Sequence, residues 1–271
     1  MYKGKITESE IKKALELFNS GVSLTKIAKI LNRDRGTLTK HLKNAGADII
    51  QHCNKKNINS NYFSSLNPHS AYWLGLLMAD GHVDLNNNTI ELTLKDEEHI
   101  KKFKNDISSD HKISTRSINE HLYYRICFRD SQIISDLKSY GFYNTKTYSW
   151  DIPIIPENLM KYFICGLFDG DGSIRLYNTA GSCCSGLVCY SEKTLYEIKQ
   201  IICQFTGIDP THISIKKYGE KIPELRIHSI DANKKFLDWI YKDSDIYLDR
   251  KYDKYLEFCR LKAISEKNKK L

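Results

Sequence analysis

No apolar run in this sequence approaches the ~18 residues of a membrane span, and the N-terminus lacks the apolar region of a secretory signal. We therefore expect no membrane association and a cytoplasmic location, in a bacterium, a phage-infected host or an organellar matrix. Paired Cys-x-x-Cys and His-Glu-x-x-His spacings are also missing, although the chain has eight cysteines and nine histidines. The cysteines are expected to be reduced thiols, and neither kind of zinc site is indicated.

Acidic residues are scarce in one part of the chain only. The formal net charge is +8, and residues 1–56 contain 12 Lys and Arg against 5 Asp and Glu. Nucleic acid is the obvious anionic partner for such an end. The nearly neutral remainder can bind DNA only if its positive side chains gather on one face. A length of 271 residues allows one large or two modest domains.

The most informative feature is an apolar segment that occurs twice. Residues 71–81 read Ala-Tyr-Trp-Leu-Gly-Leu-Leu-Met-Ala-Asp-Gly, and residues 162–172 read Tyr-Phe-Ile-Cys-Gly-Leu-Phe-Asp-Gly-Asp-Gly. Each copy carries two small residues four positions apart, Gly75 with Ala79 and Gly166 with Gly170. This spacing puts both small residues on one helix face and lets two backbones approach closely. We therefore expect two helices that pack on each other, within a duplicated fold.

Each copy ends in Asp-Gly, at Asp80-Gly81 and Asp171-Gly172. The glycines are expected to end their helices in the left-handed conformation. A carboxylate there faces the negative end of the helix dipole, at a cost of ~0.3–1 kcal/mol, and two such ends repel each other. A divalent cation held between Asp80 and Asp171 would resolve the conflict. A single Asp-Gly is usually only a turn signal, but the duplication favours a functional pair.

Three stretches near the N-terminus have apolar residues at helical spacing: residues 8–20, 23–31 and 34–46. Their lengths and turns indicate a helix-turn-helix whose last helix would contact phosphates and base edges in a major groove. The side chains expected to point outward are Arg33, Arg35, Thr37, Thr39, Lys40 and Lys43. The alternative is a helical hairpin with a solvated basic face. Residues 49–67 are polar and rich in asparagine, which predicts a linker.

After Gly81 the apolar period changes from helical to two, which predicts β-hairpins. The order αββαββα occurs twice, so we expect an α+β fold of two pseudo-symmetric repeats, plus the small all-α helix-turn-helix domain. The expected boundaries are 1–48, 49–67, 68–152 and 153–271, the last with a basic tail. The polar faces of the two sheets would form a basic saddle that fits the major groove. Its expected DNA-binding residues are Lys95, Arg125, Arg129, Arg175, Lys216 and Arg226.

The two apolar segments resemble the paired signature helices of LAGLIDADG homing endonucleases, in the single-chain, two-motif form. The resemblance covers roughly residues 67–265. It implies that Asp80 and Asp171 are catalytic metal ligands for Mg²⁺ or Mn²⁺, with Ala79 and Gly170 in the same metal site. Lys146 and Lys251 are similar to the family's active-site lysines. One departure is that the motif's earlier acidic position holds Asp169 in the second copy and Met78 in the first.

The sequence therefore predicts a sequence-specific, metal-dependent double-strand DNA endonuclease of the intron-homing type. It would act as a monomer with internal pseudo-twofold symmetry, without a small-molecule substrate. The metal would generate hydroxide from water and stabilise the leaving oxygen, and the family implies a staggered cut across the minor groove. Two alternatives stay open: a DNA-binding transcription regulator of the same fold without cleavage, and an RNA maturase for a host intron.

Overall fold

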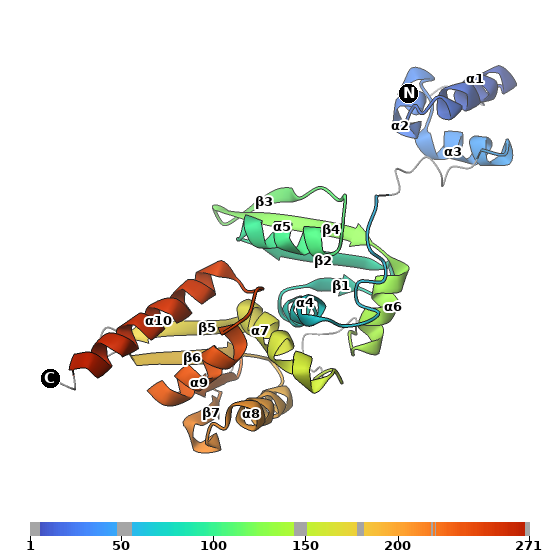
Figure 1. Ribbon diagram of the computed structural model, residues 1–271. Coiled ribbons are helices and arrows are strands. Elements are labelled where there is room, and N and C mark those ends of the chain that lie inside the picture. The colour runs from blue at the N-terminus through green and yellow to red at the C-terminus, as the bar shows by residue number, and fades with distance from the viewer. Residues whose placement is uncertain are drawn as a thin grey trace. The chain divides into compact units, whose positions relative to one another are not determined.

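The structure, a computed structural model, describes residues 6–47, 56–143, 151–177, 182–217, 219 and 221–268. The chain divides into two compact units, Met1–Asn57 and Ile58–Leu271, whose helices and strands are labelled in Figure 1. In the described ranges, no helix combines the length and the apolar composition required to cross a bilayer.

The first unit contains three short helices: α1 (Glu8–Asn19), α2 (Leu24–Ile30) and α3 (Arg35–Asn44). Each helix begins at a side-chain cap, because Thr7, Ser23 and Asp34 accept a hydrogen bond from the backbone N–H three residues later. The unit has its own small core, made of Ala14, Phe18, Ile27, Ala28, Leu31, Leu38 and Leu42. The three helices predicted from the apolar spacing are therefore present.

The second unit contains the predicted αββαββα order twice. The first repeat comprises α4 (Pro68–Ala79), β1 (His82–Asp84), β2 (Thr89–Leu94), α5 (Glu97–Asp106), β3 (Ser114–Ile118), β4 (His121–Arg129) and α6 (Ser131–Ser139). The second repeat comprises α7 (Met160–Asp171), β5 (Gly172–Tyr177), β6 (Ser182–Val188), α8 (Glu192–Thr206), β7 (Ile213–Lys216), β8 (Glu224–Ile227) and α9 (Ile230–Tyr241). A further helix, α10 (Asp249–Asn268), follows the second repeat.

Each repeat forms a four-stranded antiparallel sheet, in the order β1-β2-β4-β3 and β5-β6-β8-β7. Residues along β2 alternate between half-buried and buried, as the predicted period of two requires. One face of each sheet therefore packs on the core and the other carries the polar side chains. The mixed α/β fold with two such sheets confirms the predicted fold class.

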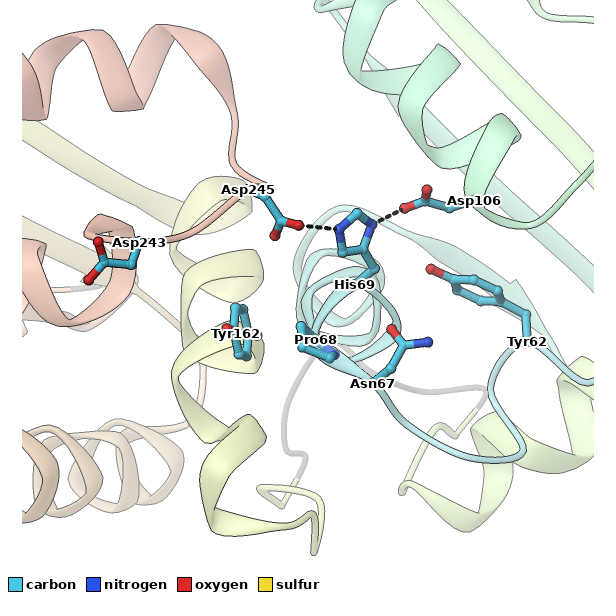
Figure 2. A pocket seen from close by; sticks show the side chains of 8 residues that line it. All are labelled: Tyr62, Asn67, Pro68, His69, Asp106, Tyr162, Asp243 and Asp245. Atoms are coloured by element: carbon cyan, nitrogen blue, oxygen red, sulfur yellow. Dashed lines mark hydrogen bonds and ion pairs between the residues drawn. The ribbon is translucent and has the colours of Figure 1, made fainter.

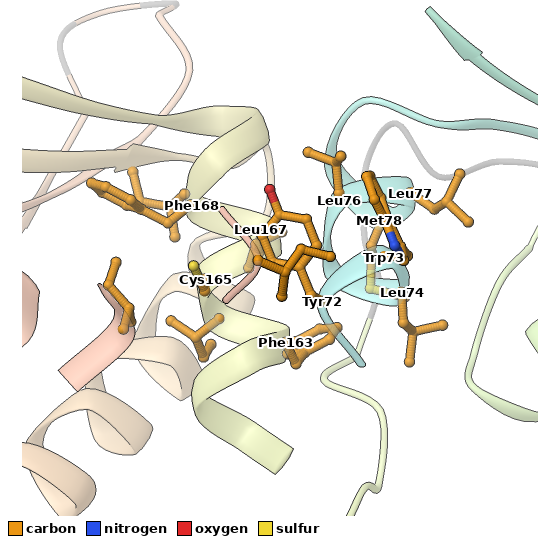
Figure 3. Packing of buried hydrophobic residues seen from close by; sticks show 14 of the residues in the cluster. Tyr72, Trp73, Leu74, Leu76, Leu77, Met78, Phe163, Cys165, Leu167 and Phe168 are labelled. Carbon is orange, nitrogen blue, oxygen red and sulfur yellow. The ribbon is translucent and has the colours of Figure 1, made fainter. Parts of the chain in front are cut away.

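Helices α4 and α7 lie side by side where the two repeats meet (Figure 1). Nine of the twelve residues of α4 are buried, since this helix is enclosed on nearly every side. The backbones touch: a Cβ added to Gly75 would lie 2.1 Å from the carbonyl oxygen of Phe163, and one on Gly166 would lie 1.9 Å from that of Tyr72. Tyr72, Phe163 and Leu167 fill the space beside this crossing (Figure 3). The predicted pairing of the two helices through small residues is confirmed.

The prediction that Gly81 and Gly172 adopt the left-handed conformation is wrong. Gly172 is extended, with φ −86° and ψ 166°, and Gly81 is not among the glycines with positive φ. Both glycines are needed for a different reason, because the chain turns directly from helix to strand. A Cβ would lie 2.6 Å from the carbonyl oxygen of Leu77 at Gly81, and 2.4 Å from that of Phe168 at Gly172.

The segment predicted as a linker, residues 49–67, joins the second unit from Ile58 onward. Phe63 is fully buried and Tyr62 is 8% exposed in the core of that unit. The Ser60 hydroxyl donates to Asp130 at 2.7 Å, which ties this segment to the start of α6. The polar composition of the segment predicted a linker, but its two aromatic residues, Tyr62 and Phe63, are buried in the core of the second unit. Residues 48–55 lie outside the described ranges.

We expect Gly166→Ala to destabilise the second unit by roughly 3 kcal/mol or more, above the usual range for overpacking, because the new methyl group meets backbone that cannot rotate away. Chemical denaturation of the full chain would measure this loss. The matched control is Gly36→Ala, in the exposed first turn of α3, whose Cβ would meet only the Asp34 side chain at 3.2 Å. Equal stability of the Gly166→Ala variant and the parent would contradict a backbone contact between α4 and α7.

Candidate active site

Asp80 and Asp171 lie at the adjoining C-terminal ends of α4 and α7. Asp80 caps α4, and Asp171 is the last residue of α7. A Cβ on Gly170 would lie 2.3 Å from the Ala79 Cβ and 3.4 Å from the Asp80 Oδ2 atom. The Asp80 carboxylate therefore lies beside the residue that precedes Asp171. Asp80 is exposed and Asp171 is half-buried, so the pair is accessible from solvent.

Lys251, on α10, brings a buried cation to the end of α7. Its side chain is almost fully buried, and its Nζ donates to the carbonyl oxygens of Phe168 at 2.6 Å, Asp169 at 2.7 Å and Gly170 at 3.3 Å. Burial lowers the pKa of Lys251 to about 8, while the charges of nearby carboxylates, Asp80 and Asp171 among them, act in the opposite direction. The ammonium is therefore mostly protonated at neutral pH. It supplies positive charge where the helix dipole and the carboxylates are negative.

A buried carboxylate, Asp169, holds the segment that carries Lys251. Its Oδ1 accepts a hydrogen bond from the Tyr241 hydroxyl at 2.6 Å, and its Oδ2 accepts from the Tyr72 hydroxyl and the Leu248 N–H, both at 2.7 Å. Burial raises the pKa of Asp169, and these hydrogen bonds act against that rise. Because Leu248 precedes α10 directly, Asp169 fixes the start of this helix. Sequence reasoning did not assign this role; the available signal was the extra acidic residue in the second motif.

We call the adjoining C-terminal ends of α4 and α7, with Asp80 and Asp171, the seam. Its carboxylate oxygens fit a hard cation. Within the described residues, no three His, Cys, Asp or Glu side chains converge on one point. Mg²⁺ usually keeps several waters and needs only one or two carboxylates, so Asp80 and Asp171 form an adequate donor set. Ala79 precedes Asp80 in the chain, and Gly170 lies between Asp171 in the chain and the Asp80 carboxylate across the helix pair. Lys146 lies in residues 144–150, outside the described ranges.

Three of the four arginines of the predicted basic saddle form ion pairs with glutamates. Arg125 binds Glu91 at 2.6 Å, and Glu224 binds Arg226 at 2.6 Å and Arg175 at 3.2 Å. The Arg125 guanidinium holds the pKa of Glu91 below its usual value. The other predicted side chains are exposed: Lys95 lies over the Tyr123 ring, Arg129 donates to Thr89, and Lys216 ends β7. Glutamates thus neutralise part of each sheet's positive charge, which the sequence analysis did not predict.

Arg33 does not point outward, so that prediction is wrong. Its side chain is buried, and its Nη2 donates to Glu10 at 2.6 Å, which ties the turn before α3 to α1. The hydrogen bond from Arg33 lowers the pKa of Glu10 to about 2. Four of the other predicted residues are exposed: Arg35, Thr37, Lys40 and Lys43. Thr39 is half-buried, and its hydroxyl donates to the Arg35 carbonyl oxygen at 2.7 Å.

A pocket of about 620 Å³ lies beside the N-terminal ends of α4 and α7, away from Asp80 and Asp171 (Figure 2). In it, His69 bridges the repeats: Nδ1 lies 2.9 Å from Asp106, and Nε2 lies 3.2 Å from Asp245. A histidine can donate from both nitrogens only as the imidazolium. Burial disfavours that form, but the hydrogen bonds to both carboxylates outweigh burial and raise the pKa of His69.

Comparison with known families matches residues 67–133 and 158–241 to the LAGLIDADG-like domain. No curated protein matches this sequence. The matched residues include both signature helices and all eight strands of the two sheets.

Several solved structures are similar in fold. The homing endonuclease I-WcaI bound to its DNA recognition sequence has a TM-score of 0.50 at 13% identity, over 72% of this chain and 90% of that chain. The meganuclease I-SmaMI bound to uncleavable DNA has a TM-score of 0.50 at 12% identity, over 76% and 91%. Full-length DUF199/WhiA from Thermatoga maritima has a TM-score of 0.48 at 17% identity, over 74% of this chain and 64% of that chain. This chain therefore spans less than two thirds of that relative. At 13% and 12% identity, the likeness to I-WcaI and I-SmaMI shows the fold alone.

The His69 bridge predicts a pH dependence of stability. Since the folded-state pKa of His69 is raised, its contribution is fully present below the unfolded-state value of about 6.5 and is lost as pH rises through the folded-state value. Solvent screening limits it to below about 1 kcal/mol. Urea unfolding of the full chain at about pH 6 and pH 8 should show a smaller difference for His69→Asn than for the parent. His121→Asn, at an exposed histidine that begins β4, is the control and should match the parent.

Proposed function

This chain belongs to the LAGLIDADG-like domain family, and from that premise we propose that it is a sequence-specific, metal-dependent endonuclease that cuts both strands of DNA. One observation carries the proposal: α4 and α7 bring the accessible Asp80 and Asp171 together at their C-terminal ends. Two carboxylates in this position repel each other and the helix dipoles. A protein that only bound DNA would gain nothing from placing them near phosphate.

Each residue of the seam has a role in this proposal. Asp80 and Asp171, with Ala79 and Gly170 beside them, would hold divalent cations such as Mg²⁺ or Mn²⁺. When bound, such a cation makes water a stronger nucleophile and stabilises the leaving oxygen. Lys251 keeps a protonated ammonium beneath the carboxylates and limits their repulsion. Lys146 is proposed as its counterpart in the first repeat.

The DNA would lie on the polar faces of both sheets, since a two-stranded ribbon fits the major groove. The three-helix unit would act as a helix-turn-helix arm, with α3 in a major groove and Arg35, Thr37, Lys40 and Lys43 toward the DNA. The structures of I-WcaI and I-SmaMI that resemble this fold hold DNA, which supports this assignment. A single chain with two repeats would bind as a pseudo-symmetric monomer.

A DNA-binding regulator without cleavage is the second candidate. The observation in its favour is the basic three-helix unit, which has its own core and could bind DNA without the seam. Both candidates bind DNA, and they differ in the use made of Asp80 and Asp171. A cleavage assay on variants at these two positions therefore distinguishes them.

We expect Asp80→Asn and Asp171→Asn each to lower double-strand cleavage by at least about 100-fold, because each removes a carboxylate that would hold the cation, and the cation is what would stabilise charge in the transition state. Target DNA would first be selected by binding from a randomised duplex library. Cleavage of a plasmid that carries this target would then be followed with Mg²⁺ and with EDTA. Binding should remain within a few-fold of the parent.

Asp110→Asn, at an exposed carboxylate between α5 and β3, is the control and should cut as the parent does. Selective binding by the parent without cleavage in Mg²⁺ or Mn²⁺ would refute the nuclease and support the regulator. Normal cleavage by either seam variant would refute the site.

The proposed arm makes a separate prediction about salt. Replacing Arg35, Lys40 and Lys43 together with alanine should weaken DNA binding and lower the slope of log K against log salt by about 3, one unit for each phosphate contact. The control replaces Lys12, Lys13 and Lys29, exposed lysines on α1 and α2, and removes the same charge from the same unit. Equal effects of the two triple variants would show that α3 is not the contacting helix.

A further inference from the structure

The polar face of the second sheet carries an ion-pair cluster that spans three strands. Glu224 Oε2, on β8, accepts from Arg226 Nε at 2.8 Å and Nη2 at 2.6 Å, and Glu224 Oε1 accepts from Arg175 Nη2 at 3.2 Å. The Glu224 side chain is 13% exposed, against 26% for Arg226 and 50% for Arg175. The carboxylate therefore lies low on the sheet, and the two guanidinium groups stand above it toward solvent.

A glycine makes this arrangement possible. Gly186 lies on β6, between the strands that carry Arg175 and Glu224. A Cβ at Gly186 would lie 2.5 Å from Glu224 Oε1 and 3.2 Å from the Ser173 hydroxyl. The bare backbone of β6 therefore lets Glu224 reach across the strand to Arg175. Any side chain at this position would move the carboxylate away from one of its two partners.

The strand register identifies the matching positions in the first sheet. His82 and Ser173 each follow the glycine that ends the motif, and they pair with Glu91 and Gly186. These two residues pair in turn with Cys127 and Arg226 on the next strand. Counting from these pairs, Arg125 in the first repeat corresponds to Glu224 in the second, and Asp84 corresponds to Arg175.

The two sheets are therefore opposite in charge at two matching positions. Where the first repeat has Arg125 and Asp84, the second has Glu224 and Arg175. The carboxylate that pairs with an arginine has also changed strands, from Glu91 on β2 to Glu224 on β8. A fold with matching backbones thus presents different hydrogen-bonding groups to its ligand in each half.

Resting on the proposed DNA binding, we propose that Glu224 and Gly186 are specificity determinants of the second repeat. They fix the orientation of the Arg175 and Arg226 guanidinium groups. A guanidinium group presents its N–H donors as a planar fork, which recognises the O6 and N7 acceptors of guanine in the major groove. In the first repeat, Glu91 holds the single fork of Arg125. The target is then a duplex whose halves carry guanines at different positions, two facing the second repeat and one facing the first.

The test measures base preference by binding alone, so that cleavage plays no part. The full-length chain would select duplexes from a randomised library in EDTA, as the parent and as Glu224→Gln, Gly186→Ala and Glu91→Gln. Glu224→Gln and Gly186→Ala should each reduce guanine preference roughly 10-fold at two positions of one half-site. Glu91→Gln should do so at one position of the other half-site. Glu192→Gln, the same charge change at the start of α8, should leave the profile unaltered.

Several results would overturn the proposal. They are a profile unchanged in both Glu224→Gln and Gly186→Ala, an equal loss of preference in both halves, and a parent that selects no sequence. Thermal melting of each variant would identify a folding defect in Gly186→Ala, and Glu224→Gln then decides the question alone. A parent that selects the expected guanines and cuts nothing with Mg²⁺ would refute the nuclease and leave this proposal standing.

Discussion

The backbone contact between α4 and α7 is the constraint on which the rest of the second unit depends. No side chain can stand at Gly75 or Gly166, because a single methyl group would overlap a carbonyl oxygen of the facing helix. Close crossing fixes the relative position of the repeats, and with it the separation of Asp80 from Asp171. The same contact determines how the two sheets face their ligand, since each sheet begins directly after its helix. A looser pair of helices would change the candidate site and the saddle together.

This contact also creates an electrostatic conflict. Two helix C-termini with a terminal carboxylate each are brought together, and Asp169 adds a third carboxylate that is fully buried. The Lys251 ammonium group reduces this conflict, because it donates to the last carbonyl oxygens of α7. Two tyrosine hydroxyls and a backbone N–H donate to the Asp169 carboxyl group. These groups donate hydrogen bonds to the buried Asp169 carboxyl group and to the end of α7, and they leave Asp80 and Asp171 accessible from solvent. The remaining negative charge is where the proposed cation would be needed, and the cation in turn would attract a DNA phosphate.

Much of the fold could be predicted from the sequence, because the informative patterns were local and repeated. Apolar period and spacing predicted α4, α7 and the strands, and the duplication predicted their pairing. The failures concern contacts that no local pattern encodes. The inward turn of Arg33 depends on Glu10, on another helix, and the docking of Phe63 depends on a core built mostly from later residues. Of the candidate site, the duplicated motif indicated Asp80 and Asp171, and the resemblance to a known family added Lys251. The hydrogen bonds of Asp169 join segments far apart in the chain and could not be foreseen.

The two repeats share a backbone plan but not a chemistry. Buried Asp169 belongs to the second repeat, and its counterpart in the first is Met78. The same asymmetry appears on the sheets, where Arg125 and Glu224 occupy matching positions with opposite charge. Backbone packing at the seam requires a glycine at the crossing in both helices, Gly75 in one and Gly166 in the other. Positions on the polar faces of the sheets carry no such requirement, so charge can diverge there without loss of fold. Because helix packing and the charge of the sheets depend on different residues, one pseudo-symmetric scaffold could recognise an asymmetric ligand.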